Sequence, residues 1–557
     1  LPVLPEGAVI YDALLNIWQY NFSAGTVNSF YMEAHEVTGS WTDGSATWNN
    51  QPAINATVLD YAEVKSVIAS GGKYAVPKQF HITKPMKNWY ADKERAEGEK
   101  QNWGICFKMY NEGSVASASF VSSNHPTGGD TNITTAMYPS CMIYYRDASG
   151  LEDYYSYHEQ SVGRAGTCYV NNYNGNMVLI HPDASTSGNV FPVSLSHVYN
   201  AAEHNTDGGL GYGWRLSAWK KLESTDNSNY PYRYTDEDGT KHYFYKDNAD
   251  NNKLKDEDGL GLVITQTSSD DDNSYMIMET KDKVKMIFRK DGWISREISP
   301  HGYSDTNPLT ITYIYETIQS KLCLTKIKDP TGSVIQLYYS TTGRLTSIMD
   351  EAGRSIRFAY ENNDLKTITY PDNKVTRYGY GVGDEQHLLM YVKAPDEYEV
   401  DYIYKNDCGV KRVTHIAERK GSQIGREIKI SYPGSNKTIF RESGLDGILE
   451  NIGDDITAEK GDDRIYIYQF DDSGRPVCIY DQDGNAVSYS YFEEGQKRHK
   501  LSVTGSTMKP ILYYSALENN FTSATTFLSA PTTFNLANNQ SYAPSNFNDK
   551  YANKDIT

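Results

Sequence analysis

A repeating unit of about 20 residues is the feature that most constrains how this chain can fold. One tyrosine recurs at intervals of 24, 21, 20 and 24 residues, at Tyr315, Tyr339, Tyr360, Tyr380 and Tyr404. Each unit holds two strand-like stretches joined by an Asp/Gly or Asn turn, as in GRLTSIMDEAGRSIRFAY at 343–360. Because one hairpin cannot bury its apolar face whereas stacked neighbours can, the spacing predicts a continuous β-sheet over residues 236–500.

Within the unit, particular positions recur and are expected to be structural. The pattern G-R-L-x-x-I-x-D-x-x-G begins at Gly343 and Arg344 and places Asp350 after an Ile-containing strand. The aromatic strand that follows ends on the repeat tyrosine, for which we expect rings stacked between neighbouring repeats. The residues expected to mark the repeat are Gly343, Arg344, Asp350, Tyr339, Tyr360 and Tyr380.

Composition favours an all-β protein and argues against two classes of partner. The 557 residues include 46 Tyr and 43 Gly, and tyrosine is a strand former whose ring supplies buried area. We expect under about 8% helix. The formal net charge of −18 makes a nucleic-acid partner unfavourable, because phosphates would be repelled. No run of 18 apolar residues occurs, so we expect no membrane span.

Within residues 1–147, polar and apolar residues alternate as they do in the short strands of a β-sandwich. The block WTDGSATWNNQP at 41–52 contains Trp41, Trp48 and Pro52, and Trp89 and Trp103 follow. Tryptophans in such a module either stack on sugar rings or fill the core. Core packing is favoured, because Thr47 and Asn49 alternate with Trp48 as a strand with one buried face requires.

Two further regions flank the repeats. Residues 148–235 form a connector with two motif blocks, N-G-N-x-V-x-x-H…S-H-V-Y-N ending at Asn200 and G-Y-G-W-R-L-S at 211–217. Residues 501–557 are rich in Asn, Ser, Thr and Ala, which predicts a linker or the start of a further module. The chain begins in mid-pattern at Leu1 without a signal peptide, so we expect a piece of a longer protein.

These motifs resemble a known protein architecture. The repeats and the two connector blocks resemble bacterial YD-repeat (Rhs-type) proteins, and the Trp block with the Trp89…Trp103 pair resembles a DNRLRE domain, a module related to carbohydrate-binding modules. The resemblance implies a partly truncated, jelly-roll-like sandwich followed by a sheet that spirals as part of a shell. In toxin-bearing members of the family, the shell encloses a C-terminal toxic domain. It also implies a secreted or cell-surface, wall-associated protein.

No catalytic or metal-binding pattern was found in the sequence. H-E-x-x-H and G-x-S-x-G are absent. The D-x-D-G pieces at 236–239, 256–259 and 481–484 lack the remaining ligands of a calcium loop, so hairpin turns are expected there, as for DPTGS at 329–333. The six cysteines are dispersed, which favours isolated thiols. We therefore expect no enzyme activity, no cofactor and no metal dependence.

Two functions remain open from the sequence. The first is a structural shell that delivers a cargo domain encoded further on in the full-length protein. The second is a surface adhesin, in which the sandwich binds a cell-wall or extracellular glycan and the repeats act as a stalk.

Overall fold

The computed structural model of the chain is dominated by strands, with 56% strand and 5% helix. This confirms the prediction of an all-β protein with little helix. The structure describes residues 4, 8–42, 46–66, 68–69, 72–73, 75–91, 102–111, 113, 115–125, 133–147, 149–152, 154–187, 190–247, 252–266, 276–280, 282–301, 308–407, 410–434, 436–450, 456, 461–471, 473–491, 499–502, 527–528, 534–535, 541–542 and 555–556.

The chain divides into two compact units. The first unit comprises residues 1–486 and 491–499, and the second comprises residues 487–490 and 500–557. Six short strands lie at the boundary or in the second unit: β37 (Ala486–Tyr491), β38 (His499–Ser502), β39 (Phe527–Leu528), β40 (Phe534–Asn535), β41 (Ser541–Tyr542) and β42 (Asp555–Ile556). No helix in the described ranges is long and apolar enough to cross a membrane.

The N-terminal region contains two facing antiparallel sheets. One sheet contains β6 (Val76–His81), β1 (Ala8–Ala24), β8 (Ala116–Phe120) and β9 (Ser140–Asp147). The other contains β3 (Asp60–Lys65), β2 (Ser29–Glu36) and β7 (Ile105–Met109), while β4 (Ile68–Ala69) and β5 (Gly72–Lys73) form a separate hairpin. Ile17 and Phe80 of the first sheet pack against Met32, Ala34 and Val64 of the second. The alternation read from the sequence therefore gives a sandwich with one apolar core.

A single α-helix and short 3-10 turns accompany these sheets within the described ranges. Helix α1 (Thr83–Ala91) buries Met86 and Trp89 on one face, three residues apart, against Ile10 and Ala13 of β1. The short turns are η1 (Trp48–Asn50) and η4 (Thr135–Met137).

The structure corrects the core prediction for Trp41. Its side chain is 46% exposed, and its indole Nε1 donates a hydrogen bond of 2.7 Å to the carbonyl oxygen of the half-buried Trp103. The strand expected around Trp48 is instead the 3-10 turn η1, so the alternation of Thr47 and Asn49 does not define a buried face. The side chain of Trp48 lies outside the described part of the chain.

The connector forms an antiparallel sheet of its own, here called the inner sheet. Its strands pair in chain order: β10 (Tyr157–Ser161), β11 (Thr167–Asn171), β12 (Met177–Ser185), β13 (Ser194–Asn200) and β14 (Trp214–Leu216). Two short turns, η5 (Gly163–Ala165) and η6 (Ala201–Glu203), lie between them. Gly209, Gly211 and Gly213 all adopt positive φ before β14, so the glycine cluster makes the turn that feeds this buried strand.

The repeats form one large sheet, here called the repeat sheet, in which successive strands are neighbours. Its strands in the first unit are β15 (Lys221–Ser224), β16 (Tyr232–Thr235), β17 (Lys241–Lys246), β18 (Lys253–Asp256), β19 (Val263–Gln266), β20 (Met276–Glu279), β21 (Lys285–Phe288), β22 (Ile294–Ile298), β23 (Thr310–Ile318), β24 (Lys321–Lys328), β25 (Val334–Tyr339), β26 (Leu345–Met349), β27 (Ser355–Glu361), β28 (Asp364–Thr369), β29 (Val375–Tyr380), β30 (Leu389–Lys393), β31 (Tyr398–Asp407), β32 (Val410–Lys420), β33 (Gln423–Gly434), β34 (Lys437–Glu442), β35 (Arg464–Phe470) and β36 (Pro476–Asp481). The turn η7 (Gly383–Glu385) precedes β30.

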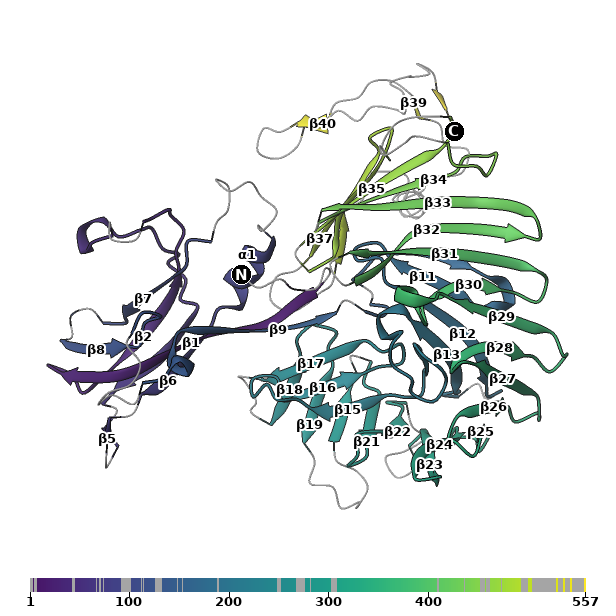
Figure 1. The fold of residues 1–557 in the computed structure, drawn as a ribbon, viewed down its shortest axis with the longest axis horizontal. Helices are drawn as coiled ribbons and strands as arrows, with labels where there is room; N and C mark the ends of the chain where they lie inside the picture. The colour runs from purple at the N-terminus through teal and green to yellow at the C-terminus, as the bar shows by residue number, and fades with distance from the viewer. Residues whose placement is uncertain are drawn as a thin grey trace. The chain divides into compact units, whose positions relative to one another are not determined.

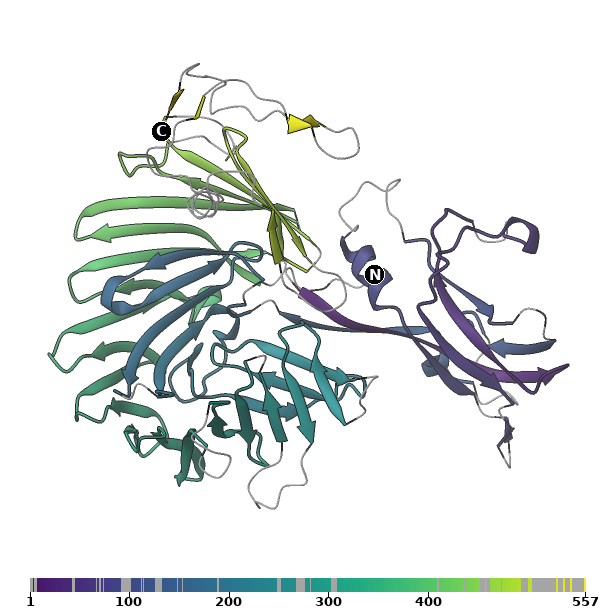
Figure 2. The ribbon, with the colours of Figure 1, turned by 180° about the vertical axis from the view of Figure 1, so that it is seen from behind.

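The inner sheet and the repeat sheet share a single hydrophobic core. Leu179 and Trp214 of the inner sheet belong to the same buried cluster as Ile348, Ile368 and Val392 of the repeat sheet. Strands β11, β12 and β13 lie beside the green strands of the repeat sheet in both views (Figures 1 and 2). The repeats therefore bury one face by packing it on the connector as well as on each other.

Candidate functional site: a buried His–Asp–His cluster

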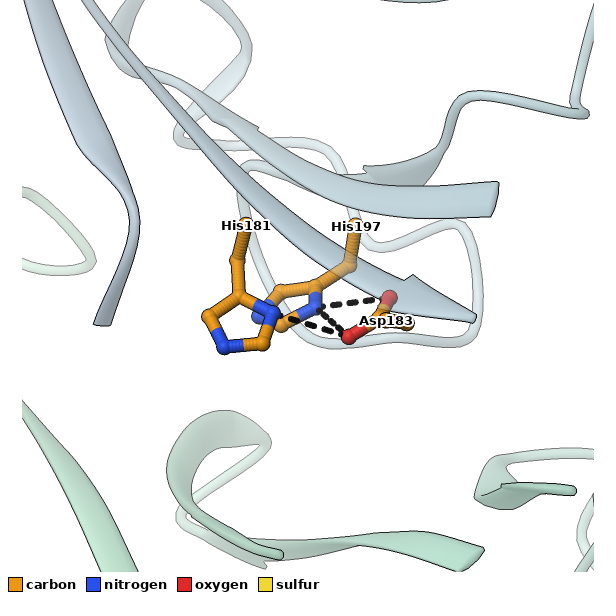
Figure 3. A group of neighbouring side chains, drawn as sticks. All are labelled: His181, Asp183 and His197. Carbon is orange, nitrogen blue, oxygen red and sulfur yellow. Dashed lines mark hydrogen bonds and ion pairs between the residues drawn. The ribbon is translucent and has the colours of Figure 1, made fainter. Parts of the chain in front are cut away.

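Two histidines meet on neighbouring strands of the inner sheet. His181 on β12 pairs directly with His197 on β13, so both side chains lie on the same face. The pairing then skips a residue between Pro182 and Ala184, which places Asp183 in a β-bulge. A bulge re-aims the side chain of the extra residue, and here the carboxylate of Asp183 points at both imidazole rings (Figure 3).

One carboxylate contacts both rings through the same type of nitrogen. The Nδ1 atom of His181 lies 2.9 Å from Oδ1 of Asp183. The Nδ1 atom of His197 lies 2.8 Å from Oδ1 and 2.9 Å from Oδ2 of the same side chain. The two rings stack with centroids 4.6 Å apart. The three side chains are at most 1% exposed, so the cluster is closed to solvent.

The outer nitrogens of both rings are held by tyrosines of the repeat sheet. The Nε2 atom of His181 lies 2.8 Å from the hydroxyl of Tyr370, and that of His197 lies 3.1 Å from the hydroxyl of Tyr378. Tyr370 follows β28 and Tyr378 lies on β29, so a single hairpin provides both hydroxyls. Tyr370 occupies the turn position that Asp350 occupies one repeat earlier, which makes this hairpin a departure from the repeat pattern.

Aromatic rings and a carbonyl complete the surroundings. The hydroxyl of Tyr370 also donates to the backbone carbonyl of Arg164, at 2.8 Å, and lies 2.9 Å from Oγ1 of Thr376. The rings of Trp214 and Phe358 lie 5.0 and 5.4 Å from the ring of His197. Each polar atom in the cluster thus has a partner inside an apolar wall.

Burial and mutual attraction set the charges in the cluster. Burial lowers the pKa of His197 and His181 lowers it further, although Asp183 acts in the opposite direction. Burial acts to raise the pKa of Asp183, but the two histidines outweigh it and hold the pKa below the ordinary aspartate value. The carboxylate of Asp183 is therefore ionised, and the two imidazole rings are the groups that stabilise its charge.

The donor set suits metal coordination better than substrate chemistry. Imidazole nitrogens and a carboxylate are ligands that Zn²⁺ takes in proteins. One such atom from each of the three residues lies within 4.8 Å of the others. A substrate would need access, and these side chains have none.

A second buried cluster joins the connector to the first hairpins of the repeat sheet. The Nε2 atom of His242 lies 3.3 Å from Glu152 and 3.3 Å from Asp236, and its Nδ1 atom lies 3.0 Å from Asp258. Burial acts to lower the pKa of His242, but Asp258 and Glu152 outweigh it and raise the pKa well above the ordinary value. The surrounding acidic side chains therefore favour the imidazolium form of His242.

The residues predicted to mark the repeat lie in their expected hairpins. Gly343 turns with φ +75°, and Arg344 pairs with Asp207 at 2.6 Å with its guanidinium 4.8 Å from the ring centre of Tyr360. Asp350 accepts backbone N–H bonds from Ala352 and Arg354.

The predicted turns are confirmed, and one further regularity appears. Asp329 and Asp481 accept backbone N–H bonds two and four residues on, as Asp350 does. Asp236 and Asp256 likewise accept N–H bonds within their own turns.

Four repeat tyrosines donate their hydroxyls to the carbonyl of a leucine 15 residues earlier, in the pairs Tyr339–Leu324, Tyr360–Leu345, Tyr380–Leu365 and Tyr404–Leu389.

The predicted residues of the sandwich do not form a site together. Trp89 is buried on the face of α1 that packs against β1, Pro52 lies half-buried in a loop, and Trp41 and Trp103 touch through one hydrogen bond. Five of the six cysteines fall within the described residues and none of these is in a disulfide: Cys106, Cys141, Cys168, Cys323 and Cys478.

Sequence reasoning missed both histidine clusters. The available signal was His181-x-Asp183 on a strand, because residues two apart share a face, together with His197 in the neighbouring S-H-V-Y-N block.

Comparison with known proteins supports the repeat architecture. Residues 167–244, which contain the His–Asp–His cluster, match a domain of unknown function, DUF6531, and residues 339–372 match the RHS repeat. The tRNA3(Ser)-specific nuclease WapA of Bacillus spizizenii is 29% identical over 357 residues, which cover 57% of this chain and 14% of the relative. The tRNA nuclease WapA of Bacillus subtilis is 29% identical over 356 residues, with the same coverage of 57% and 14%.

A solved structure aligns with part of the chain. The crystal structure of TcdB2-TccC3 without its hypervariable C-terminal region aligns with 60% of this chain and 16% of its own, at a TM-score of 0.25 and 13% identity. The chain spans 14% of the length of the WapA relatives. The resemblance to YD-repeat proteins is thus confirmed for the repeats, whereas the resemblance of residues 1–147 to a DNRLRE domain stays a prediction.

Proposed function

We propose that this RHS-repeat chain is a non-catalytic part of a secreted or cell-wall-associated bacterial protein, whose repeat sheet is a scaffold around a C-terminal cargo domain outside this chain. One observation carries the proposal. Strands β15 to β36 follow one another as neighbours in a single sheet whose core is shared with the inner sheet. A sheet that gains one hairpin with each repeat becomes longer in one direction as repeats are added. This geometry suits an enclosing shell better than a compact binding site.

The chemistry of the described residues agrees with a scaffold. The two clusters of titratable side chains are enclosed, since His181, His197 and His242 are at most 1% exposed. The WapA relatives are named as tRNA nucleases, and this chain spans 14% of their length. We therefore assign any toxic activity of the full-length protein to its cargo domain, and none to this chain.

Two measurements test the scaffold. In the full-length protein, the region that follows this chain should resist protease under native conditions and become sensitive once the repeat sheet is destabilised, for example by Tyr360→Ala. The chain of residues 1–557 alone should leave tRNA intact. Cleavage of tRNA by this chain, or a downstream region equally sensitive in both full-length proteins, would contradict the proposal.

A specific observation favours glycan binding as a second candidate function. Tyr31 of β2 and Tyr61 of β3 are 53% and 63% exposed, and their rings meet edge to face at 6.2 Å. Tyr110, at the end of β7, is 71% exposed and hydrogen-bonds through its backbone to Tyr31. Exposed aromatic rings on a sheet face offer flat apolar surfaces on which sugar rings stack.

Binding of the whole chain to purified cell-wall polysaccharide tests this second candidate. The double variant Tyr31→Ala with Tyr61→Ala should lose retention, because both stacking surfaces are removed. Tyr338→Ala is the matched control, since Tyr338 is a 43% exposed tyrosine of the repeat sheet. Equal retention of the double variant and the control would remove this function from residues 1–147.

A further inference from the structure

We propose that His181, Asp183 and His197 bind one divalent transition-metal ion, with Zn²⁺ as the best fit to the donors. A metal site goes beyond the scaffold function. It also differs from the sequence-based expectation that the protein needs no metal. Two imidazoles and a carboxylate are the mixed nitrogen and oxygen donors that Zn²⁺ accepts, and no thiolate is needed. Their ligand atoms already converge within 4.8 Å.

The orientation of the imidazoles is the first argument. In metal sites, the ring nitrogen that does not bind the metal is held by a hydrogen bond, which fixes the tautomer and aims the other nitrogen. Here the tyrosines Tyr370 and Tyr378 hold both Nε2 atoms, at 2.8 and 3.1 Å. Both Nδ1 atoms consequently face the same carboxylate.

The number of donors is the second argument. Both oxygens of Asp183 lie within 2.9 Å of the Nδ1 atom of His197, so both point into the cluster. A carboxylate that binds through one oxygen makes three donors together with the two Nδ1 atoms, the number that zinc sites with an open fourth position take from the protein. Zn–N and Zn–O bonds of about 2.0–2.1 Å place tetrahedral donors roughly 3.3 Å apart, so the distances of 2.9 and 2.8 Å between Oδ1 and the two Nδ1 atoms need to widen by only a few tenths of an ångström.

Charge is the third argument. The side chain of Asp183 is completely buried, and no Arg or Lys forms an ion pair with it among the residues that the structure describes. A buried carboxylate needs a cation, and here that cation is either a proton on an imidazole or a metal ion. Tyr370 donates its proton to the carbonyl of Arg164, which leaves the Nε2 atom of His181 as a donor and its Nδ1 atom free for the metal.

The location gives the ion a structural consequence. His181 and His197 belong to the inner sheet, whereas the tyrosines that orient them belong to one hairpin of the repeat sheet. Fixing the imidazoles with a metal would also fix this contact, so removal of the ion should loosen the packing of the two sheets.

The whole chain tests the proposal directly. The purified protein should contain close to one zinc per molecule by inductively coupled plasma mass spectrometry. After removal of the metal with a chelator, calorimetric titration with ZnCl₂ should show one site, and Co²⁺ should give the visible absorption of a tetrahedral complex. Chelation should lower the melting temperature, and ZnCl₂ should restore it.

Variants then locate the ion. Asp183→Asn keeps a hydrogen-bonding group of the same shape but loses the charge, and it should abolish the zinc equivalent. Tyr378→Phe leaves all ligands in place and should weaken binding about 10–100-fold, as changes to groups that orient ligands do. His158→Gln is the matched control, because His158 lies on β10 of the same sheet and packs against Phe440. It should bind zinc like the parent.

Other outcomes overturn the proposal. A parent protein without metal that also binds no added Zn²⁺ or Co²⁺ shows that the cluster holds a proton instead, whatever the variants do. Zinc that is lost in His242→Gln but kept in Asp183→Asn belongs to the second cluster. If Asp183→Asn fails to fold, Tyr378→Phe decides, because affinity equal to that of the parent contradicts an ion at this place.

Discussion

In four of the repeat tyrosines, the hydroxyl ties its hairpin to the one before it. Tyr360 donates to the carbonyl of Leu345 at 2.6 Å, and its ring packs against the shared core. Tyr360→Ala should lower the free energy of unfolding by about 3–5 kcal/mol, as other large aromatic truncations do. Tyr360→Phe keeps the ring and should cost only about 0.5–1.5 kcal/mol for the lost hydrogen bond. Denaturant unfolding measures both.

An exposed tyrosine of the preceding repeat is the control for this prediction. Tyr338 is 43% exposed, so Tyr338→Ala should stay within about 0.5 kcal/mol of the parent. If Tyr360→Ala also stays within that range, the repeat tyrosines are not structural and the sugar-stacking interpretation gains support.

The environment of His158 predicts that its contact between the inner sheet and the repeat sheet is sensitive to acid. Burial lowers its pKa from 6.5 to about 4, with Arg426 acting in the same direction, and its Nε2 atom has no hydrogen-bond partner within the described ranges. Between these two values the unfolded chain binds a proton that the folded chain does not. Stability is therefore lost as the pH falls from 6.5 towards 4, by up to about 3 kcal/mol.

The variant His158→Gln isolates this contribution from all other titrating groups. The difference in unfolding free energy between the parent and the variant should shrink as the pH falls through this window and be constant above it. A difference that does not change with pH would show that His158 is free to take up a proton in the folded protein.

Each hairpin turn depends on one residue with a left-handed backbone conformation. Gly353 has φ +75° and open space where a Cβ would lie, and Asn373 occupies the same place in the next repeat with φ 61°. Gly353→Ala should cost about 1–2 kcal/mol through backbone strain alone. Gly353→Asn should cost clearly less, because asparagine tolerates this conformation.

Thermal and denaturant unfolding of these two variants checks the turn geometry. Equal losses for Ala and Asn would indicate that the space around the turn, rather than its φ, sets the cost. The same comparison at Gly332, which also has positive φ, should give the same order.

The hairpins were predictable from sequence because their determinants are local. Tyr360, Asp350 and Gly353 recur at fixed spacing, and each acts on its own repeat or on the one before it. The environment of Trp41 was not predictable, since exposure depends on which loops cover a strand end.

The His–Asp–His cluster shows more clearly what could not be predicted from the sequence. His181 and Tyr370 are 189 residues apart in the chain, and His197 and Tyr378 are 181 residues apart. No spacing rule joins them, because their contact depends on how the inner sheet packs on the repeat sheet. The replacement of the turn aspartate by Tyr370 was visible in the sequence, but its meaning was not.

Ring stacking and a shared buried cluster join the first sandwich strand to the repeat sheet and the connector. Tyr11 of β1 stacks on Tyr243 of β17 with ring centres 4.1 Å apart. Val9 of β1 shares a small buried cluster with Tyr154 and Tyr155 of the connector. These contacts join β1 to the repeat sheet and to the connector, and residues 1–147 fall in the same compact unit as the repeats.

Arg146, at the end of β9, is the charged link in this junction. Its Nε atom lies 2.7 Å from Glu257 and its Nη2 atom 3.6 Å from Asp258, with the arginine side chain 1% exposed. Arg146→Met leaves buried carboxylates without their counter-ion and should cost about 3–5 kcal/mol in denaturant unfolding. Arg289→Met removes an exposed pair with Asp291 and should cost at most about 1 kcal/mol. Adding Asp258→Asn to Arg146→Met should recover part of the loss, because one stranded charge is removed. If the two arginine variants lose the same stability, water reaches the junction and Arg146 is not a buried partner.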